Sequence, residues 1–467
     1  MRLLKALRIS PSESIAFVGA GGKTTALFRL AGEYLEPGQG LDYPDTVLIS
    51  ATTHLSIAQT RWANHHFVIH STEDFLALEG NLPAGSILFT GPPNKRGRVD
   101  GLNQEIINHI HNLSLKYRFP LLLEADGSCQ RPLNVPVDHE PGVPDWVNTV
   151  VVAAGLSALN KPINSKWVHR PDRYSQKCNQ TQGSIITPNT IASVLLNLSG
   201  GLKNSQSKSR LICLFNQADT QELQANSNHI TGDLLSIYHS VVIASLNPSQ
   251  DGANLAPFED EVLSVHEPTA GILLAAGSAD RMRLPKQVLL FKGVPLVTQI
   301  AKTAINSDLS PVIVVTGAYV QPIHEALAGL PLFLVHNPDW ESGMSSSLQT
   351  GLRSAPPNIG SAIFLLSDQP FVSTALLRKL VRVHSLTLSP IIAPISNGRR
   401  GNPVLFDRTT FPDLLNVKGD IGGRAIFNSF PITNLEWDNA SDFFDIDTPD
   451  DFKKISAPDN ENFPNGI

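Results

Sequence analysis

The stretch that decides the fold is Ser14 to Thr25, SIAFVGAGGKTT: an apolar run, a glycine-rich turn, then a lysine and two threonines. Apolar runs rich in β-branched residues that end in such a turn are typical of buried parallel strands. After the turn, apolar residues from Leu27 to Tyr34 follow the i, i+3, i+4, i+7 spacing of a helix. The sequence therefore predicts a strand, a turn and a helix, which is the repeating unit of an α/β fold.

The same alternation recurs along the chain in two sets. The first set has apolar runs at 15–18, 47–49, 121–123, 150–153, 211–215 and 241–244, and the second has runs at 272–275, 312–315, 363–366 and 391–393. Between the sets lies a polar, acidic stretch broken by prolines, which is the composition of a linker. We therefore expect two tandem Rossmann-like domains with mostly parallel sheets, at 1–247 and 268–467, joined by a linker at 248–267.

Composition excludes several classes of protein. The chain has 467 residues, with 36 Lys and Arg against 42 Asp and Glu, so its formal net charge is −6. A general nucleic-acid binder would be basic, so we expect no nucleic-acid partner. The apolar runs are far shorter than the ~20 residues that span a bilayer, so we expect no membrane segment. Three cysteines far apart, without a CxxC pair, fit a reducing cytoplasm.

The glycine-rich turn after the first strand has the composition of a phosphate-binding loop. Glycines let backbone amides approach phosphate oxygens, and a helix N-terminus adds a positive dipole. Lysine supplies a point charge and threonine a hydroxyl for Mg²⁺. The loop is the short form GxxGKT, without the earlier glycine of the full P-loop pattern. We expect the following residues to bind a nucleotide, ATP or GTP: Gly19, Gly21, Gly22, Lys23, Thr24 and Thr25.

Two carboxylates follow the strand at 121–123, in the sequence Glu124-Ala-Asp126. Residues i and i+2 of a strand share a face, so both side chains can point at one metal–phosphate site. This placement resembles a Walker B motif. We therefore add Glu124 and Asp126 to the nucleotide site of the first domain.

Several motifs of the first half occur together in one known family. Within about 10–247 the chain contains, in this order, the motifs GAGGKTT, ATTHL, EADGS followed by RPLNVP, HEP, HRP and FNQAD. The segment resembles the YqeC-like accessory proteins of selenium-dependent molybdenum hydroxylases. The resemblance implies a nucleotide-binding maturation factor, with an apo molybdenum hydroxylase as its client. It implies no defined reaction.

The second half opens with a different phosphate motif. Gly271 to Gln287 reads GILLAAGSADRMRLPKQ, in which a strand runs into Ala-Ala-Gly and then reaches Arg281 and Lys286. Nucleotidyl transfer requires a close backbone approach to the triphosphate, and cations that neutralise the α-phosphate and the leaving pyrophosphate. We therefore expect Arg281 and Lys286 to be catalytic.

Acidic residues follow at two further places. Asp368 ends the strand at 363–366, where the carboxyl edge of the sheet would hold Mg²⁺. Asp445 and Asp447 lie near the end of the chain, and both face one side if that segment is extended. We expect Asp368, Asp445 and Asp447 to bind the metal, with Asp368 also catalytic; alternatively, Asp447 caps a short helix.

The second half resembles the MobA-like nucleotidyltransferases and, among them, the molybdenum cofactor cytidylyltransferases. This resemblance covers about 270–455 and rests on the motifs LAAG with RM and PK, VTGA, GMSSS, SDQP, RGNP and DIDTPDD. It implies Mg²⁺, CTP as substrate and Mo-molybdopterin as acceptor, with Ala276 selecting cytidine. Two positions depart from the family pattern, Arg283 and Asn402, where glycine and histidine are usual. The resemblance implies nucleotide binding by Ala275, Ala276, Gly277, Gly317, Gly343 and Ser345, and acceptor binding by Asn402, Pro403 and Arg424.

Taken together, the sequence predicts a cytoplasmic molybdenum cofactor cytidylyltransferase fused to a nucleotide-binding accessory domain. Two alternatives stay open. The acceptor could be a sugar or alditol phosphate, because one fold serves many substrates. The whole chain could instead be a nucleotide-switched chaperone that carries cofactor to a hydroxylase.

Overall fold

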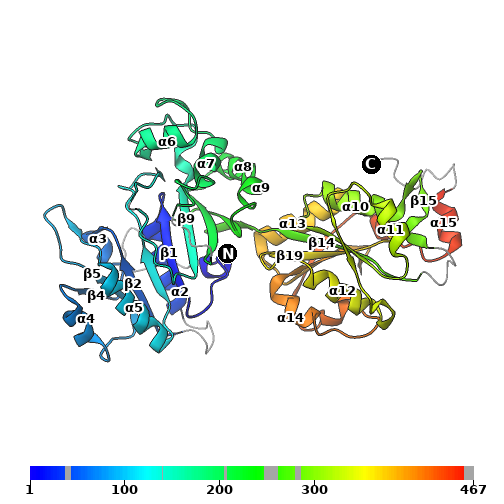
Figure 1. Ribbon diagram of the computed structural model, residues 1–467, viewed down its shortest axis with the longest axis horizontal. Coiled ribbons are helices and arrows are strands. Elements are labelled where there is room, and N and C mark those ends of the chain that lie inside the picture. Colours follow the sequence, from blue (N-terminus) through cyan, green and yellow to red (C-terminus); the bar gives the residue numbers. More distant parts are fainter. Residues whose placement is uncertain (37–43, 139, 204–207, 247–260, 279–284, 457–467) are drawn as a thin grey trace. The chain divides into compact units, whose positions relative to one another are not determined.

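The computed structural model describes residues 1–36, 44–138, 140–203, 208–246, 261–278 and 285–456. The chain divides into two compact units, Met1–His266 (unit 1) and Glu267–Ile467 (unit 2). Each unit is an α/β structure built on one large sheet (Figure 1). The expected α/β class with two mostly parallel sheets is therefore confirmed.

Unit 1 contains a nine-stranded sheet in the order β13-β12-β11-β9-β1-β7-β2-β5-β4. All neighbouring strands are parallel except β12 and β13. The central strands are apolar and buried on both faces, as parallel strands between helices must be. The strands are β1 (Ser14–Gly19), β2 (Thr46–Ala51), β4 (His65–Val68), β5 (Gly85–Thr90), β7 (Leu121–Glu124), β9 (Thr149–Gly155), β11 (Arg210–Asn216), β12 (Ser240–Ala244) and β13 (Val262–His266).

The edge strand β13 corrects the expected linker. Residues 262–266 pair with β12 in antiparallel register, so they belong to the sheet of unit 1. The prediction missed this strand because the preceding acidic, proline-containing stretch dominates the local composition. Much of the rest of the expected linker, 247–260, lies outside the described residues.

Unit 2 contains an eight-stranded mixed sheet in the order β18-β17-β14-β19-β22-β20-β21, with β23 beside β20. The strand β22 runs antiparallel between β19 and β20, and the sequence prediction did not include it. The strands are β14 (Thr269–Ala275), β17 (Val312–Thr316), β18 (Phe333–His336), β19 (Ser361–Leu366), β20 (Ile391–Ser396), β21 (Arg399–Arg400), β22 (Val404–Asp407) and β23 (Ile432–Glu436).

Helices cover both faces of each sheet (Figure 1). In unit 2, α10 and α13 pack on one face of the sheet and α12 and α14 on the other, which gives two separate apolar layers. The helices of unit 1 are α1 (Leu3–Ala6), α2 (Lys23–Leu35), α3 (Ile57–Thr60), α4 (Thr72–Leu78), α5 (Gln104–Tyr117), α6 (Pro171–Lys177), α7 (Pro188–Leu195), α8 (Gln221–Asn228) and α9 (Thr231–Leu234). Those of unit 2 are α10 (Leu296–Asn306), α11 (Val320–Ala326), α12 (Met344–Arg353), α13 (Thr374–Thr387), α14 (Phe411–Leu414) and α15 (Pro449–Ser456).

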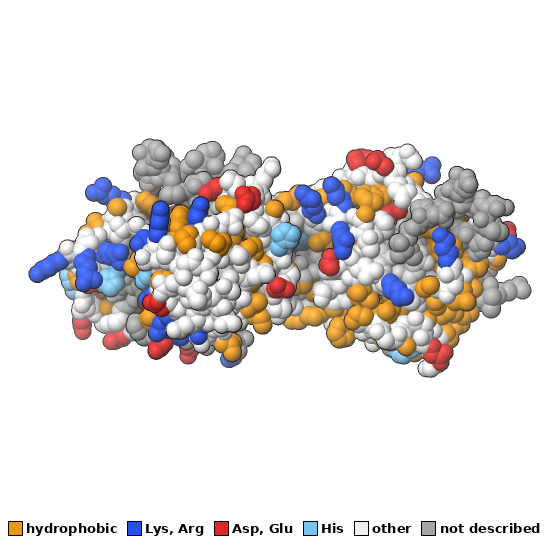
Figure 2. All heavy atoms as spheres, turned by 90° about the horizontal axis from the view of Figure 1, so that it is seen from above, with side chains coloured by type: hydrophobic (Ala, Val, Ile, Leu, Met, Phe, Trp, Pro, Cys, Tyr) orange, Lys and Arg blue, Asp and Glu red, His pale blue; other side chains and the backbone are white. Residues whose placement is uncertain are grey.

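Two further features concern the surface charge and the helices. On the face drawn in Figure 2, Lys and Arg side chains are interspersed with Asp and Glu side chains. Within the described ranges, none of the helices has both the length and the apolar character needed to cross a membrane.

Candidate functional sites

The glycine loop of unit 1, residues 19–22, joins the end of β1 to the start of α2. Gly19, Gly21 and Gly22 all have positive φ angles, which glycine adopts without strain. At Gly21 the space is also limiting, because a Cβ there would lie 2.3 Å from the backbone nitrogen of Gly155. The loop therefore requires glycine for both its conformation and its packing.

The amides of this loop are used differently from what the sequence suggested. The Gly19 amide donates to Asp126 Oδ2 (2.8 Å), that of Ala20 to the Ala153 carbonyl (2.9 Å), and that of Gly21 to the Arg131 carbonyl (3.2 Å). These three donors therefore fix the loop to its own scaffold. The first amides of α2, from Lys23 onward, have no partner within the helix and no side-chain cap. The start of α2 therefore presents backbone donors of the kind that bind anions.

Lys23 and Asp126 form a buried ion pair beneath the loop. The Nζ atom of Lys23 lies 2.8 Å from Asp126 Oδ1 and donates to the Gly19 carbonyl (2.7 Å). Burial alone would lower the pKa of Lys23, but the charges of Asp126 and Glu124 outweigh it and raise that pKa. Lys23 is therefore charged, and Asp126 holds it at the loop.

Thr24 and Glu124 form the second contact of the site. The Thr24 hydroxyl donates to Glu124 Oε2 (2.7 Å). Burial raises the pKa of Glu124, and the charge of Lys23 opposes this effect. A hydroxyl and two carboxylates, from Thr24, Glu124 and Asp126, are oxygen donors of the kind that Mg²⁺ prefers. These three side chains do not form a complete metal site by themselves, since the described residues contain no group of three His, Cys, Asp or Glu side chains placed to hold a metal.

These residues open into a cavity of about 780 Å³ at the carboxyl edge of the sheet. Its lining includes Gly21, Gly22, Lys23, Thr24, Thr25 and Glu124. Gly19 and Asp126 instead line a separate, much smaller cavity. Thr52 and Thr53, which follow β2, also line the larger cavity. Their hydroxyl oxygens are buried and have no hydrogen-bond partner among the described residues. His54 lies 3.3 Å from Asp100 at the same cavity.

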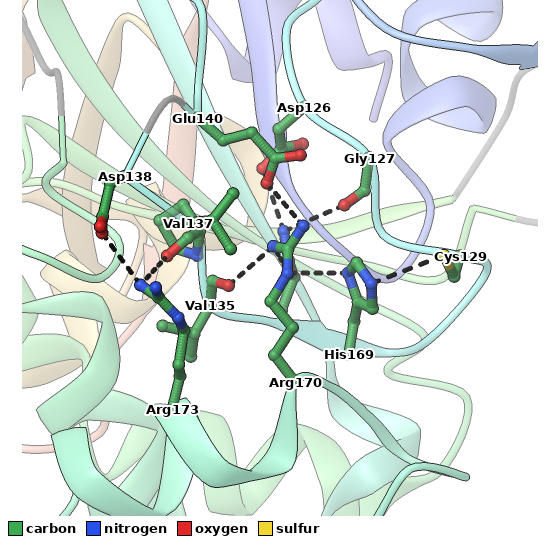
Figure 3. Close-up of polar contacts among 12 residues, drawn as sticks. Asp126, Gly127, Cys129, Val135, Val137, Asp138, Glu140, His169, Arg170 and Arg173 are labelled. Carbon is green, nitrogen blue, oxygen red and sulfur yellow. Dashed lines mark hydrogen bonds and ion pairs between the residues drawn. The ribbon is translucent and has the colours of Figure 1, made fainter.

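Several residues near the loop received no site role from the sequence. The side-chain amide of Asn216 donates to the Gly21 carbonyl (3.0 Å), so the FNQAD motif supports the loop. Arg170 forms an ion pair with Glu140 (2.8 Å), and both are labelled in Figure 3. Arg170 also donates to Asn134 Oδ1 (3.2 Å). The HRP, HEP and RPLNVP motifs contain these residues, so motif matching could have identified them. Only the fold brings Glu140 and Arg170 to the lining of this cavity, with Asn134 in contact with Arg170.

In unit 2, the end of β14 lies against the turn after β17. The Ala276 carbonyl accepts from the Ala318 amide (3.0 Å), and a Cβ at Gly317 would lie 2.5 Å from that carbonyl oxygen. Gly317 therefore permits the close approach of the two segments. The Gln287 side chain donates to the Gly277 carbonyl (2.8 Å) and thereby fixes the start of the motif. The expected catalytic Arg281 lies outside the described residues.

Lys286 contacts two of the expected metal ligands. Its Nζ atom lies 2.5 Å from Asp368 Oδ2 and 3.9 Å from Asp447 Oδ1. The other oxygen of Asp368, Oδ1, is buried and has no hydrogen-bond partner among the described residues. Burial raises the pKa of Asp445, and the charges of Asp368 and Asp447 add to this effect, although the side-chain amide of Gln369 donates to Asp445 (2.7 Å). Lys286 and the acidic residues therefore form one charged cluster.

A second cavity, of about 340 Å³, lies beside this cluster and is lined by Asn402, Asp420, Arg424, Asp445, two glycines and apolar side chains. Asn402, Arg424 and Asp445 also line an adjoining, more polar cavity of about 500 Å³. The other expected residues are not part of either lining. Ser345 is buried and its amide donates to the Gly419 carbonyl (3.2 Å), Gly343 packs against Gly419, and Pro403 is buried.

Comparison with known proteins gives each unit a family. Residues 15–172 match the YqeC protein family, and residues 271–435 match the MobA-like NTP transferase domain. The chain is 30% identical to the nicotine blue oxidoreductase of Paenarthrobacter nicotinovorans, over 40% of this chain and 95% of that protein. It is 26% identical to the uncharacterized protein YqeC of Escherichia coli, over 44% of this chain and 75% of that protein. It is 29% identical to the molybdenum cofactor cytidylyltransferase of Escherichia coli, over 39% of this chain and 92% of that protein. The names of these relatives differ in activity: one is an oxidoreductase and another is a cytidylyltransferase.

Proposed function

Because the chain belongs to the YqeC family through its first unit and to the MobA-like NTP transferases through its second, we propose that it matures the molybdenum cofactor. In this proposal unit 2 transfers CMP from CTP to Mo-molybdopterin and releases pyrophosphate. The product is the cytosine dinucleotide form of the cofactor. The similarity to a molybdenum cofactor cytidylyltransferase supports this choice of substrates.

The observation that carries the proposal is the contact between Lys286 and Asp368 at the carboxyl edge of the sheet. In the reaction, a terminal phosphate oxygen of the acceptor forms a bond to the α-phosphorus of CTP. The bond from that phosphorus to the leaving pyrophosphate breaks. A cation at Lys286 would neutralise the charge that develops on these oxygens. The acceptor phosphate is already ionised at neutral pH, so the step needs no general base.

The residues around Asp368 fit a magnesium ion. Asp368 Oδ1 is buried without a hydrogen-bond partner in the described part of the chain, and Asp445 and Asp447 lie in the same charged cluster. Mg²⁺ commonly uses one or two carboxylates together with substrate phosphates. When bound, it would supply charge neutralisation between the phosphates. Asp368 would hold it, with Asp445 or Asp447 as the second ligand.

The cavities beside the cluster are our candidate for the acceptor site. Asn402 and Arg424 offer hydrogen-bond donors, and the apolar part of the lining offers a surface for a ring system. A sugar or alditol phosphate would also use a cationic residue such as Arg424, so it remains the alternative acceptor. Activity with that class of acceptor and none with Mo-molybdopterin would replace the first proposal by the second.

For unit 1 we propose binding of a magnesium nucleotide, ATP or GTP, at the start of α2. The free amides there, the charge of Lys23 and the hydroxyl of Thr24 support a phosphate site. The bound nucleotide would regulate delivery of the cofactor to an apo molybdenum hydroxylase in the cytoplasm. If the chain were only a chaperone, nucleotide would bind unit 1 but no pyrophosphate would form.

The deciding experiment supplies the full chain with Mo-molybdopterin, Mg²⁺ and each of four NTPs, and identifies the dinucleotide formed by mass spectrometry. We expect the cytosine dinucleotide, together with an equal amount of pyrophosphate. The matched control is Asp368→Asn, which keeps the shape of the side chain and removes its charge. Absence of any dinucleotide with the unaltered chain would contradict the proposal.

A further inference from the structure

Cys129 and His169 lie next to each other at the cavity of unit 1 (Figure 3). The Cys129 Sγ atom lies 3.5 Å from His169 Nε2, within reach of a thiol hydrogen bond. On the opposite side of the ring, His169 Nδ1 lies 3.1 Å from Asn134 Oδ1. A nucleophile, a base and a group that orients the base are the parts that activate a thiol.

The surrounding contacts fix the tautomer of His169. Asn134 Nδ2 donates to Asp126 (3.2 Å), and Arg170 donates to Asn134 Oδ1 (3.2 Å), so the orientation of the amide is defined. Oδ1 is an acceptor only, and therefore His169 Nδ1 carries the proton. His169 Nε2 then presents its lone pair to the thiol of Cys129. Burial lowers the pKa of His169, and the charge of Arg170 adds to this effect, so the ring is neutral and its Nε2 lone pair is free to accept a proton.

Cys129 differs from the other two cysteines in its access to solvent. Cys129 is exposed, Cys178 is half-buried and Cys213 is fully buried. Burial raises the pKa of Cys178 and of Cys213, which makes their thiolates scarcer. The chain therefore contains its own matched reference thiol in Cys178.

We propose that Cys129 is a thiol-modification site that reacts with small anionic disulfides, with His169 as the base. The thiol proton passes to His169 Nε2, and Sγ attacks one sulfur of the disulfide. A new S–S bond forms, the old one breaks, and the departing thiolate takes up the proton. The disulfide is reduced and Cys129 is oxidised to a mixed disulfide, so no other oxidant takes part.

The choice of an anionic disulfide follows from the cavity lining. Arg98 and Arg131 both line the cavity, and neither forms an ion pair within the described part of the chain, so they would attract carboxylates. Thiol–disulfide exchange requires a thiolate and access of the disulfide to it, because the departing sulfur leaves as a thiolate that carries the negative charge. Glutathione disulfide has both the bond and the carboxylates, and it is the probe used below.

Modification would also affect the glycine loop, since Cys129 and the start of α2 line the same cavity. A mixed disulfide at Cys129 would occupy space in front of Lys23 and Thr24. This consequence rests on the nucleotide site proposed above, whereas the reactivity of Cys129 does not.

The experiment treats the reduced full chain with glutathione disulfide and measures each mixed disulfide by peptide mass spectrometry. We expect folded Cys129 to react about tenfold or more faster than Cys178, and about tenfold faster than Cys129 in the urea-unfolded chain. Cys129 reacting no faster when folded than when unfolded would overturn the proposal. This comparison uses the unaltered chain, so it tests the reactivity of Cys129 even if a variant fails to fold.

A variant then tests the base. His169→Gln is expected to slow modification of Cys129 about tenfold and to leave the rate at Cys178 unchanged. The matched control is His65→Gln, at a histidine outside the cavity lining, which should leave both rates as they were. An unchanged Cys129 rate in folded His169→Gln would overturn the role of His169. Protection of Cys129 by magnesium ATP or GTP tests the proposed nucleotide site separately, so the two proposals can fail independently.

Discussion

Lys23 and Asp126 form an ion pair of 2.8 Å in which each side chain is only 2% exposed. The same carboxylate accepts from the Gly19 amide, so one acidic side chain holds both the lysine and the loop. A buried pair of this kind is sensitive to the loss of one partner, because the remaining charge stays in the interior.

The first prediction concerns this pair. Lys23→Met should destabilise unit 1 by about 3–5 kcal/mol, since it leaves Asp126 uncompensated, and it should abolish nucleotide binding. The double variant Lys23→Met with Asp126→Asn should recover part of the stability but none of the binding. Thermal unfolding and nucleotide titration measure the two effects. The control is Lys116→Met, which breaks an exposed pair with Glu79 and should change the melting temperature little. Equal losses in both lysine variants would contradict the prediction.

The second prediction distinguishes two reasons why Gly21 must be glycine: the lack of space for a Cβ and the positive φ angle. Gly21 and Gly97 both have positive φ angles, but a Cβ at Gly97 would meet nothing within 4 Å. Gly97→Ala should therefore cost about 1 kcal/mol. Gly21→Ala should cost clearly more, because its Cβ would overlap the backbone of Gly155, and it should weaken nucleotide binding. Comparable unfolding curves for the two variants would show that the loop tolerates a side chain.

The third prediction concerns Asp368. Asp368→Asn should lower the rate of nucleotidyl transfer at least a hundredfold and keep the melting temperature, since Asp368 lies at the end of β19 and not in the core. Asp413→Asn, at an exposed carboxylate in the same unit, is the control and should keep both properties. Transfer and unfolding are measured on the same preparations. A retained rate in Asp368→Asn would place the metal elsewhere.

The fourth prediction concerns the choice of nucleotide. The resemblance to cytidylyltransferases gives Ala276 the role of excluding a purine, and one methyl group in a pocket discriminates by ~10 to 200-fold. Ala276→Gly should therefore raise transfer from GTP relative to CTP by about tenfold. Ala275→Gly, at the neighbouring buried position, should leave that ratio unchanged. Equal use of GTP and CTP by the unaltered chain would remove the basis of this prediction.

The fifth prediction concerns pH. Glu33 is buried and accepts from the Leu3 and Leu4 amides, and burial raises its pKa from 4.5 to about 7. The folded state therefore binds the proton more tightly than the unfolded state, so this group makes the chain less stable as pH rises from 4.5 through 7. The contribution is at most roughly 3 kcal/mol. Glu33→Gln should flatten the dependence of melting temperature on pH in this window. Exposed Glu105→Gln should leave the dependence as it is, and an unchanged slope in Glu33→Gln would contradict the prediction.

The amino-acid sequence by itself determined the α/β alternation, the presence of two units and the glycine-rich turn between β1 and α2. These features depend on local patterns: a short apolar run predicts a strand, and a glycine turn before a helix predicts its N-terminus. The strands β13 and β22 are short, and β13 follows an acidic, proline-containing stretch, so neither was predicted; no local pattern gives their antiparallel direction either. Direction and neighbours follow from pairing with residues far away in the chain.

Only the tertiary structure decided which groups meet at each site. Asp126 and Lys23 are about a hundred positions apart, yet the parallel pairing of β1 and β7 brings them into contact. The same sheet places Asn216 in contact with the loop and uses the amides of Gly19 to Gly21 internally, which leaves the start of α2 as the proposed anion site. Hydrogen bonds across strand ends depend on register and distance, and a local sequence pattern specifies neither.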